Sequence, residues 1–239
     1  MQPSIQESAA RAAFYDFDGT LVTGNVVSRY AWLARRHPST AVATWRFAKA
    51  VAGIPLWLSL DAVSRRLFNV VFFRQYRGLT EEWLRSQGQA LLELEIKRQQ
   101  FQFAKERVAL DKTAGYHTIL VTGGLDFAIG PAAAYFGFDA ILANRLVFED
   151  GVATGRVAPP LLAGLEKVKA IQAFANHRGF DLGVSRAYSD SFSDLPMLQA
   201  VGEPIATNPD TRLRKTALEK NWAVLDLACS LHPIPGSRG

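Results

Sequence analysis

The spacing of apolar positions divides the chain into a helical block flanked by strand-like segments. Residues 12–16 form a short apolar run that ends in polar residues, which is the pattern of a buried strand. From about residue 25 to residue 115, apolar residues recur at helical spacing without strand alternation. From His117 onward, short apolar runs alternate with helical segments. Alternating strands and helices predict an α/β fold, with a parallel sheet covered by helices on both faces.

Within the helical block, the pattern predicts helices over 26–34 and 41–51. Pro55 is expected to open a further helix at its first turn and to lead it to Val71. Thr80 marks the start of a long helix that ends at Gly115. Beyond this block we expect strands over 117–122, 140–143, 184–188, 204–207 and 222–225, a hairpin of 145–148 with 152–155, and helices over 126–136, 165–177, 193–200 and 210–220.

Two carboxylates follow the first predicted strand, in the run Tyr15-Asp16-Phe17-Asp18-Gly19. Residues two apart on an extended strand point the same way, so Asp16 and Asp18 can converge on one point. Convergent carboxylates repel each other unless a cation or a proton lies between them. Magnesium suits such oxygen ligands, especially beside a phosphate. The alternative is a pair of solvated acids in an Asp-Gly turn.

Three later segments place further chemistry at strand ends or helix starts. Thr122 and Gly123 end a strand, where a hydroxyl and bare amides can hold an anion, although the same residues also suit an ordinary turn. Lys167 lies in the first turn of a helix, an unfavourable place for a cation unless an anion is near. Lys169 is the alternative, because spacing alone does not separate the two. Asp190 ends another strand, and Asp194 lies four residues on, where it could also cap a helix.

In this order, the four segments resemble the motifs of the haloacid dehalogenase superfamily of phosphohydrolases. The resemblance implies a Rossmann-like three-layer core with a parallel sheet, made of residues 1–24 and 116–239, and an inserted all-helical cap of residues 25–115. It implies that Asp16 is the nucleophile, which becomes an aspartyl-phosphate, and that Asp18 is the general acid–base. Thr122, Gly123 and Lys167 would hold the phosphoryl group. The Mg²⁺ ligands would come from Asp16, Asp18 and Asp190, with Asp194 as an outer or lysine-orienting acid.

The segment Asn144-Arg145-Leu146, with Asp150-Gly151 and Thr154-Gly155 after it, is similar to the phosphoserine-phosphatase-like branch of this superfamily. Two positions differ from that branch. Asn25 stands where phosphoserine phosphatases carry a Glu that holds the substrate amine, and Ser193 stands where Asn is usual. The resemblance therefore favours a small or lipid-like phosphorylated substrate over phosphoserine.

Tryptophan, phenylalanine and arginine are frequent in the predicted cap. Two interpretations stay open, an ordinary helical bundle with solvated arginines or an amphipathic surface that meets anionic lipid or a greasy phosphorylated substrate. Arg65 and Arg66 interrupt an apolar helix, so one of them is expected to face the substrate pocket, with Asn25 nearby. A membrane-surface contact through the cap is therefore one of the predicted partners.

The amino-acid composition limits the class of protein and the cellular compartment that we expect. The 239 residues are 49% hydrophobic, enough for a sizeable core, and Lys and Arg exceed Asp and Glu by five. This modest excess favours anionic substrates or surfaces, and no basic run with interleaved aromatics predicts nucleic-acid binding. Cys229 is the single cysteine, so no disulfide forms within the chain, which suits a reducing compartment. With no signal-peptide pattern in residues 1–11 and no apolar span of membrane length, we expect a cytoplasmic protein.

The residues and the resemblance together predict a magnesium-dependent phosphomonoesterase. A phosphoserine phosphatase or a phosphotransferase to an acceptor other than water would use the same groups. A catalytically silent module that binds a phosphorylated ligand is the non-enzyme alternative.

Overall fold

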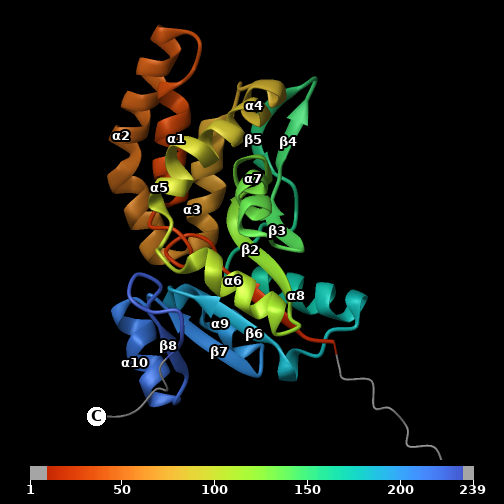
Figure 1. Ribbon diagram of the computed structural model, residues 1–239. Helices are drawn as coiled ribbons and strands as arrows, with labels where there is room; N and C mark the ends of the chain where they lie inside the picture. The colour runs from red at the N-terminus through yellow and green to blue at the C-terminus, as the bar shows by residue number, and fades with distance from the viewer. Residues whose placement is uncertain (1–9, 234–239) are drawn as a thin grey trace, which may run out of the picture.

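Six parallel strands form the central sheet of the computed structural model, which describes residues 10–233 (Figure 1). Residues 1–9 and 234–239 lie outside the described part. They include both ends of the predicted core and most of residues 1–11, the segment considered for a signal peptide. The spatial order is β3-β2-β1-β6-β7-β8. These strands are β1 (Ala12–Tyr15), β2 (His117–Leu125), β3 (Ala140–Asn144), β6 (Arg186–Ser189), β7 (Glu203–Thr207) and β8 (Ala223–Leu225).

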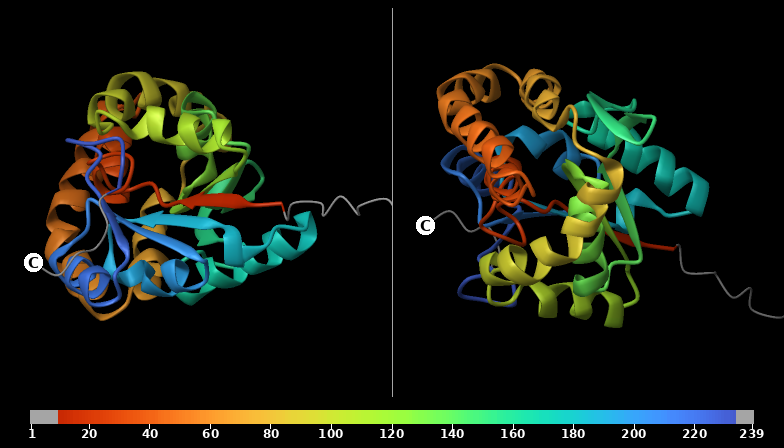
Figure 2. Two further views of the ribbon diagram at one scale, coloured as in Figure 1. Left: turned by 60° about the horizontal axis from the view of Figure 1, so that its bottom comes forward. Right: turned by 90° about the horizontal axis from the view of Figure 1, so that it is seen from above.

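Helices cover both faces of this sheet, as the fully buried central strand β1 requires. Ala13 and Tyr15 of β1 pack on the side of α6 (Ala104–Thr113) and α7 (Asp126–Phe136). Ala12 and Phe14 face the opposite core, which α8 (Leu165–Arg178), α9 (Leu195–Gln199) and α10 (Thr211–Glu219) close. Figure 2 shows the two helix layers above and below the strands. The predicted three-layer α/β core is confirmed.

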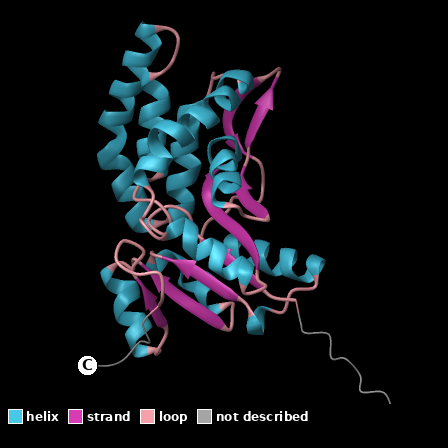
Figure 3. Cartoon of the chain, viewed as in Figure 1, coloured by secondary structure: helices cyan, strands magenta, loops and turns pink. Residues whose placement is uncertain are grey.

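The chain between β1 and β2, described in full over residues 16–116, contains helices joined by loops and turns, and no strand (Figure 3). It begins with α1 (Val26–Arg35), α2 (Thr40–Val63) and α3 (Arg65–Phe72), followed by a 3₁₀ turn over Phe73–Tyr76. After α4 (Glu81–Leu91) come a π-helical turn over Leu92–Ile96, the short α5 (Lys97–Gln99) and α6. Within residues 10–233, no helix is long and apolar enough to cross a membrane. Side chains cap the first four helices, as polar residues at helix starts commonly do: Asn25, Ser39, Ser64 and Thr80.

Two expectations for these helices were wrong. Pro55 does not open a helix but lies inside α2, which runs on to Val63. Ala50 and Trp57, two turns apart on one buried face, hold the helix on either side of the proline. The predicted long helix from Thr80 to Gly115 is also interrupted. Residues 100–103 leave the helix because the core binds their backbone: the Phe101 amide donates to Leu21 O (3.0 Å) and the Phe103 amide donates to Leu227 O (3.0 Å).

The helical insertion is fastened to the core at two places. The predicted hairpin exists as β4 (Leu146–Glu149) and β5 (Val152–Val157), and it pairs with the segment before α4. Gly78 N donates to Ala153 O (2.9 Å), and Ala153 N donates to Leu79 O (2.8 Å). Nearby, α4 crosses α7 so closely that a β-carbon on Gly88 would overlap the carbonyl of Phe127. The hairpin and α7 therefore fix how the insertion is placed above the sheet.

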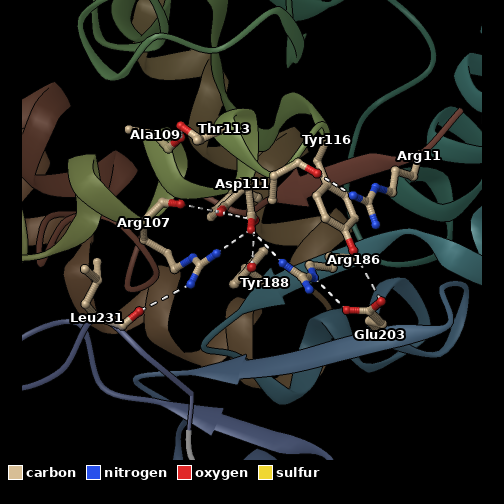
Figure 4. Close-up of polar contacts among 12 residues, drawn as sticks. Arg11, Arg107, Ala109, Asp111, Thr113, Tyr116, Arg186, Tyr188, Glu203 and Leu231 are labelled. Carbon is tan, nitrogen blue, oxygen red and sulfur yellow. Dashed lines mark hydrogen bonds and ion pairs between the residues drawn. The ribbon is translucent and has the colours of Figure 1, made fainter.

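A buried carboxylate, Asp111 of α6, ties this helix to the sheet (Figure 4). Its oxygens accept hydrogen bonds from Tyr15 Oη (2.6 Å), Tyr188 Oη (2.7 Å) and Arg186 Nη1 (2.8 Å), and from the guanidinium of Arg107. The two tyrosine rings stack with centroids 4.1 Å apart. Burial raises the pKa of both tyrosines, so they stay neutral donors. Because Tyr15 ends β1 and Tyr188 belongs to β6, this network fixes two strand ends.

We predict that Asp111→Ala lowers the free energy of unfolding by about 3–5 kcal/mol, because it leaves buried cations and two phenols without their acceptor. Urea unfolding followed by circular dichroism measures the change. Glu93→Ala is the control, since Glu93 forms an exposed pair with Lys97 on one helical turn and should cost less than about 1 kcal/mol. Equal losses in the two variants would show that the Asp111 network does not hold the sheet to α6.

Candidate active site

The carboxyl ends of β1, β2 and β6 meet at one cavity of about 280 Å³. Parallel strands present their ligand-binding ends at the same edge, so residues distant in sequence converge there. Arg66 is exposed and does not line the cavity. The other nine residues predicted for the site all line it: Asp16, Asp18, Asn25, Arg65, Thr122, Gly123, Lys167, Asp190 and Asp194.

Lys167 lies at the centre of the polar groups in this cavity. Its Nζ donates to Asp16 Oδ1 and to Asp194 Oδ2, both at 2.7 Å, and all three side chains are less than a tenth exposed. Asp194 also accepts a hydrogen bond from Ser189 Oγ (3.0 Å), so Asp194 positions the lysine from behind. Lys169, the alternative in the sequence, is 68% exposed and pairs with Glu166. The structure therefore brings Lys167, and not Lys169, to the cavity.

Negative charge exceeds positive charge around this lysine. Burial raises the pKa of Asp16 to about 6, although the ammonium of Lys167 opposes the shift. Burial, with the charge of Asp16, also raises the pKa of Asp190 to about 8. Burial alone would lower the pKa of Lys167, but the carboxylates of Asp16 and Asp194 raise it. One ammonium does not balance these acids, and a cation between Asp16 and Asp190 would remove the excess.

The turn after β1 is shaped to receive the carboxylate of Asp190. Gly19 has a φ of +80°, and a β-carbon there would overlap that carboxylate. Thr20 Oγ1 donates to Asp190 Oδ1 (3.1 Å), which holds it over the Asp18–Gly19 turn. In the described part of the chain, no three acidic, histidine or cysteine side chains form a metal cluster by themselves. The carboxylates of Asp16 and Asp190, which line the same cavity, are oxygen donors of the kind that magnesium prefers.

The wall opposite Lys167 comes from β2, which continues through the glycines to Leu125 instead of ending at Thr122. Thr122 is buried, and its Oγ1 accepts from the amide of Gly124 (2.9 Å). Asn144 Nδ2 donates to Gly123 O (2.8 Å), while its Oδ1 accepts from Leu162 N (2.8 Å). Through these two hydrogen bonds, Asn144 holds the end of β2 against the loop before α8. The Thr122 hydroxyl and the Gly123 backbone are thus fixed at the rim of the cavity.

Arg29 is the functional candidate that the sequence interpretation missed. It lies on α1, is 3% exposed and donates through Nη2 to Asp18 Oδ1. Its guanidinium stacks 5.3 Å from the ring centroid of Phe17, and its Nη1 has no hydrogen-bond partner within residues 10–233. The sequence signal that could have identified Arg29 is its charge among the apolar positions of the helix predicted over 26–34. Through Arg29, the first helix of the insertion contacts the second carboxylate of the core.

Asn25 and Arg65 approach the cavity from the insertion. Asn25 caps α1, and its Oδ1 accepts from Val27 N (3.0 Å) and Ser28 N (2.9 Å). The side-chain oxygen of Asn25 therefore already accepts two hydrogen bonds from the first turn of α1. Arg65, at the start of α3, pairs with Asp61 (3.0 Å) and is half-exposed at the cavity wall. With Asn69 of α3, which also lines the cavity, the insertion thus presents one cation and two neutral amides to whatever occupies it.

Comparisons with known proteins agree on one family. The family model of haloacid dehalogenase-like hydrolases matches residues 13–199. Phosphoserine phosphatase SerB1 of Mycobacterium tuberculosis is 32% identical over 229 residues, which cover 94% of this chain and 73% of that protein. A crystal structure from Bordetella pertussis Tohama I, of a protein with unknown function, has a TM-score of 0.79 at 26% identity and covers 92% of this chain and 100% of that one. A phospho-aspartyl intermediate analogue of phosphoserine phosphatase shares the fold at 23% identity and a TM-score of 0.64, covering 92% of this chain and 94% of that one.

Magnesium should stabilise the folded chain, because a ligand that binds only the native state raises its free energy of unfolding, by about 2.7 kcal/mol at a hundred times Kd. Thermal unfolding with and without MgCl₂ measures this. Asp190→Asn should lose most of the increase in Tm, whereas Glu93→Gln, a change at an exposed carboxylate of α4's π-turn extension, should keep it. An equal increase in all three proteins would contradict the metal site at Asp190.

Proposed function

Since the chain belongs to the haloacid dehalogenase-like hydrolase family and is a phosphatase, we propose that it hydrolyses phosphate monoesters through an aspartyl-phosphate on Asp16. The observation that carries this proposal is the buried hydrogen bond from Lys167 to one oxygen of Asp16 in the polar cavity. Lys167 holds Oδ1, which leaves Oδ2 of Asp16 free to attack phosphorus. An ammonium beside the nucleophile also lowers the repulsion between its carboxylate and an incoming phosphate dianion.

In the first step, Asp16 Oδ2 forms a bond to phosphorus while the bond to the ester oxygen breaks. Asp18, in its protonated form, gives its proton to the leaving oxygen. The Thr122 hydroxyl, the Gly123 amide and the Lys167 ammonium hold the three remaining phosphoryl oxygens. Asp16, Asp190 and the backbone carbonyl of Asp18 would hold magnesium, which would offset the negative charge between nucleophile and phosphate.

In the second step, Asp18 takes a proton from water, and the resulting hydroxide attacks phosphorus. The bond to Asp16 breaks, inorganic phosphate leaves and both acids return to their starting forms. Arg29 holds one oxygen of Asp18 from the insertion, so the other oxygen is the one that carries the proton. Contact between α1 and Asp18 thus orients the acid–base only when the insertion lies over the cavity.

We predict that Asp16→Asn reduces phosphatase turnover to background without loss of fold, because an amide is a poor nucleophile and forms no acyl phosphate. Steady-state phosphate release with a broad panel of phosphorylated metabolites and lipid head groups measures this. Asp150→Asn is the matched control, since Asp150 lies in the hairpin turn at φ 48°, a conformation that asparagine accepts. Residual turnover of Asp16→Asn within tenfold of the wild type would contradict the assignment.

For the substrate, we propose an apolar or anionic leaving group, small or lipid-like, in preference to phosphoserine. Asn25 is neutral and caps α1, so it does not balance the ammonium of an amino-acid phosphate. Arg65 instead offers a cation at the cavity wall. Phosphoserine is the second candidate, because relatives such as SerB1 carry the name phosphoserine phosphatase.

We predict that kcat/KM for phosphoserine is at least about tenfold below that for the preferred ester, roughly 1.4 kcal/mol of discrimination. Arg65→Ala should lower kcat/KM for that ester more than for a generic small phosphate monoester. Arg66→Ala is the control, because Arg66 neighbours Arg65 but lies outside the cavity lining. If phosphoserine were the best substrate, or if both arginine variants lost activity equally, the substrate proposal would be wrong.

A further inference from the structure

Helix α2 combines two properties that rarely occur together, since it is apolar on all sides and largely exposed. From Ala50 to Val63, its only polar side chains are Ser59 and Asp61. Leu58 is 66% exposed and Val63 is 79% exposed. Of the thirteen exposed large hydrophobic residues in the described part of the chain, eight lie on α2 and α3: Trp45, Val51, Ile54, Leu56, Leu58, Val63, Leu67 and Val70.

The packing of α2 explains this exposure. Its buried residues form one narrow stripe at a spacing of seven, namely Ala43, Ala50 and Trp57. Phe47 and Leu60 pack beside this stripe, and Arg46 donates to Gln75 O and Arg77 O. The outer side of the helix is exposed, and α2 lies at the outer edge of the molecule (Figures 1 and 2). A contiguous exposed apolar face of this kind marks a surface that another molecule covers.

Charge identifies the kind of molecule. Residues 25–80 contain nine Lys and Arg residues and one acid, Asp61, so this segment has a net charge of +8 in a chain of net charge +5. Basic residues also bracket the apolar stretch of α2, with Lys49 before it and Arg65 and Arg66 after it. A second copy of the chain would bring an equal positive charge against this face. Apolar side chains flanked by Lys and Arg instead complement the acyl and headgroup layers of an anionic bilayer.

We propose that the exposed faces of α2 and α3, defined by the eight residues above, dock on the surface of an anionic lipid membrane. The apolar stretch of fourteen residues rises about 21 Å, less than the roughly 30 Å of a hydrocarbon core, so α2 lies along the surface. Trp45, Leu56 and Leu58 enter the acyl boundary. The long stems of Lys49 and Arg66 reach back to the headgroup phosphates.

Helix α3 belongs both to this surface and to the wall of the cavity. Arg65 begins α3 and lines the cavity wall, while Leu67 and Val70 of the same helix belong to the docking face. Docking therefore brings the cavity mouth close to the headgroup layer, where lipid phosphates lie. This last link to the substrate rests on the proposed function, whereas the docking itself does not.

Co-sedimentation with vesicles tests the docking face. The full chain should bind vesicles of mixed phosphatidylglycerol and phosphatidylcholine at least about tenfold more tightly than vesicles of phosphatidylcholine alone. Leu56→Ser combined with Leu58→Ser should weaken binding to the anionic vesicles at least about tenfold. The matched control is Leu94→Ser combined with Val152→Ser, two exposed apolar positions elsewhere, which should bind as the wild type does.

Turnover of a small soluble phosphate ester by the same proteins separates the two proposals. The Leu56/Leu58 variant should keep wild-type turnover, since neither residue lines the cavity. If the wild-type chain turned over the ester but did not bind anionic vesicles, the docking face would be overturned and the phosphatase proposal left intact. Vesicle binding by the wild-type chain without any turnover would do the reverse. Equal weakening by the control pair would also overturn the docking face. A dimer in sedimentation equilibrium that the Leu56/Leu58 change dissociates would assign this face to a second copy instead.

Discussion

The ammonium of Lys167 between the carboxylates of Asp16 and Asp194 is the contact on which the rest of the site depends. It joins three segments that are distant in sequence: the end of β1, the start of α8 and the turn after β6. A buried ammonium is costly unless its partners are close, and each carboxylate would be equally costly without it. The same contact therefore stabilises the strand ends and prepares Asp16 for an anionic substrate. Around it, the surplus of acids leaves room for one divalent cation.

The supports of this contact lie outside the cavity. Asp111 fixes the strand ends beneath Asp16 and Asp190 through Tyr15 and Tyr188. From above, Arg29 brings the helical insertion onto Asp18. The insertion is in turn held by the β4–β5 hairpin and by α7. A change in the placement of the insertion would therefore reach the proposed acid–base directly. The outer side of the insertion, formed by α2, is the side that we propose meets the membrane.

The sequence predicted the strands of the sheet well, because apolar runs lead up to Asp16, Thr122 and Asp190. The observed bounds differ, since β2 continues beyond Thr122 to Leu125 and β6 is the short segment Arg186–Ser189. Prediction from the sequence failed where distant contacts decide local structure. Backbone bonds to Leu21 and Leu227 interrupt the helix that its spacing extended to Gly115. Buried packing on both sides of Pro55 overrides the tendency of proline to begin a helix. Arg29 was missed because its partner, Asp18, is known only once α1 is placed over the turn. The choice of Lys167 over Lys169 likewise needed the three-dimensional position of Asp16.

Chemical trapping during turnover tests most directly whether Asp16 carries the phosphoryl group. The enzyme is quenched with acid while it hydrolyses its substrate and is then reduced with borohydride, which converts an acyl phosphate, but not a free carboxylate, into an alcohol. Peptide mass spectrometry should find homoserine at position 16, in amounts that depend on substrate, and unchanged aspartate at positions 18, 190 and 194. Homoserine at any other position, or none at position 16 during active turnover, would contradict an aspartyl-phosphate on Asp16.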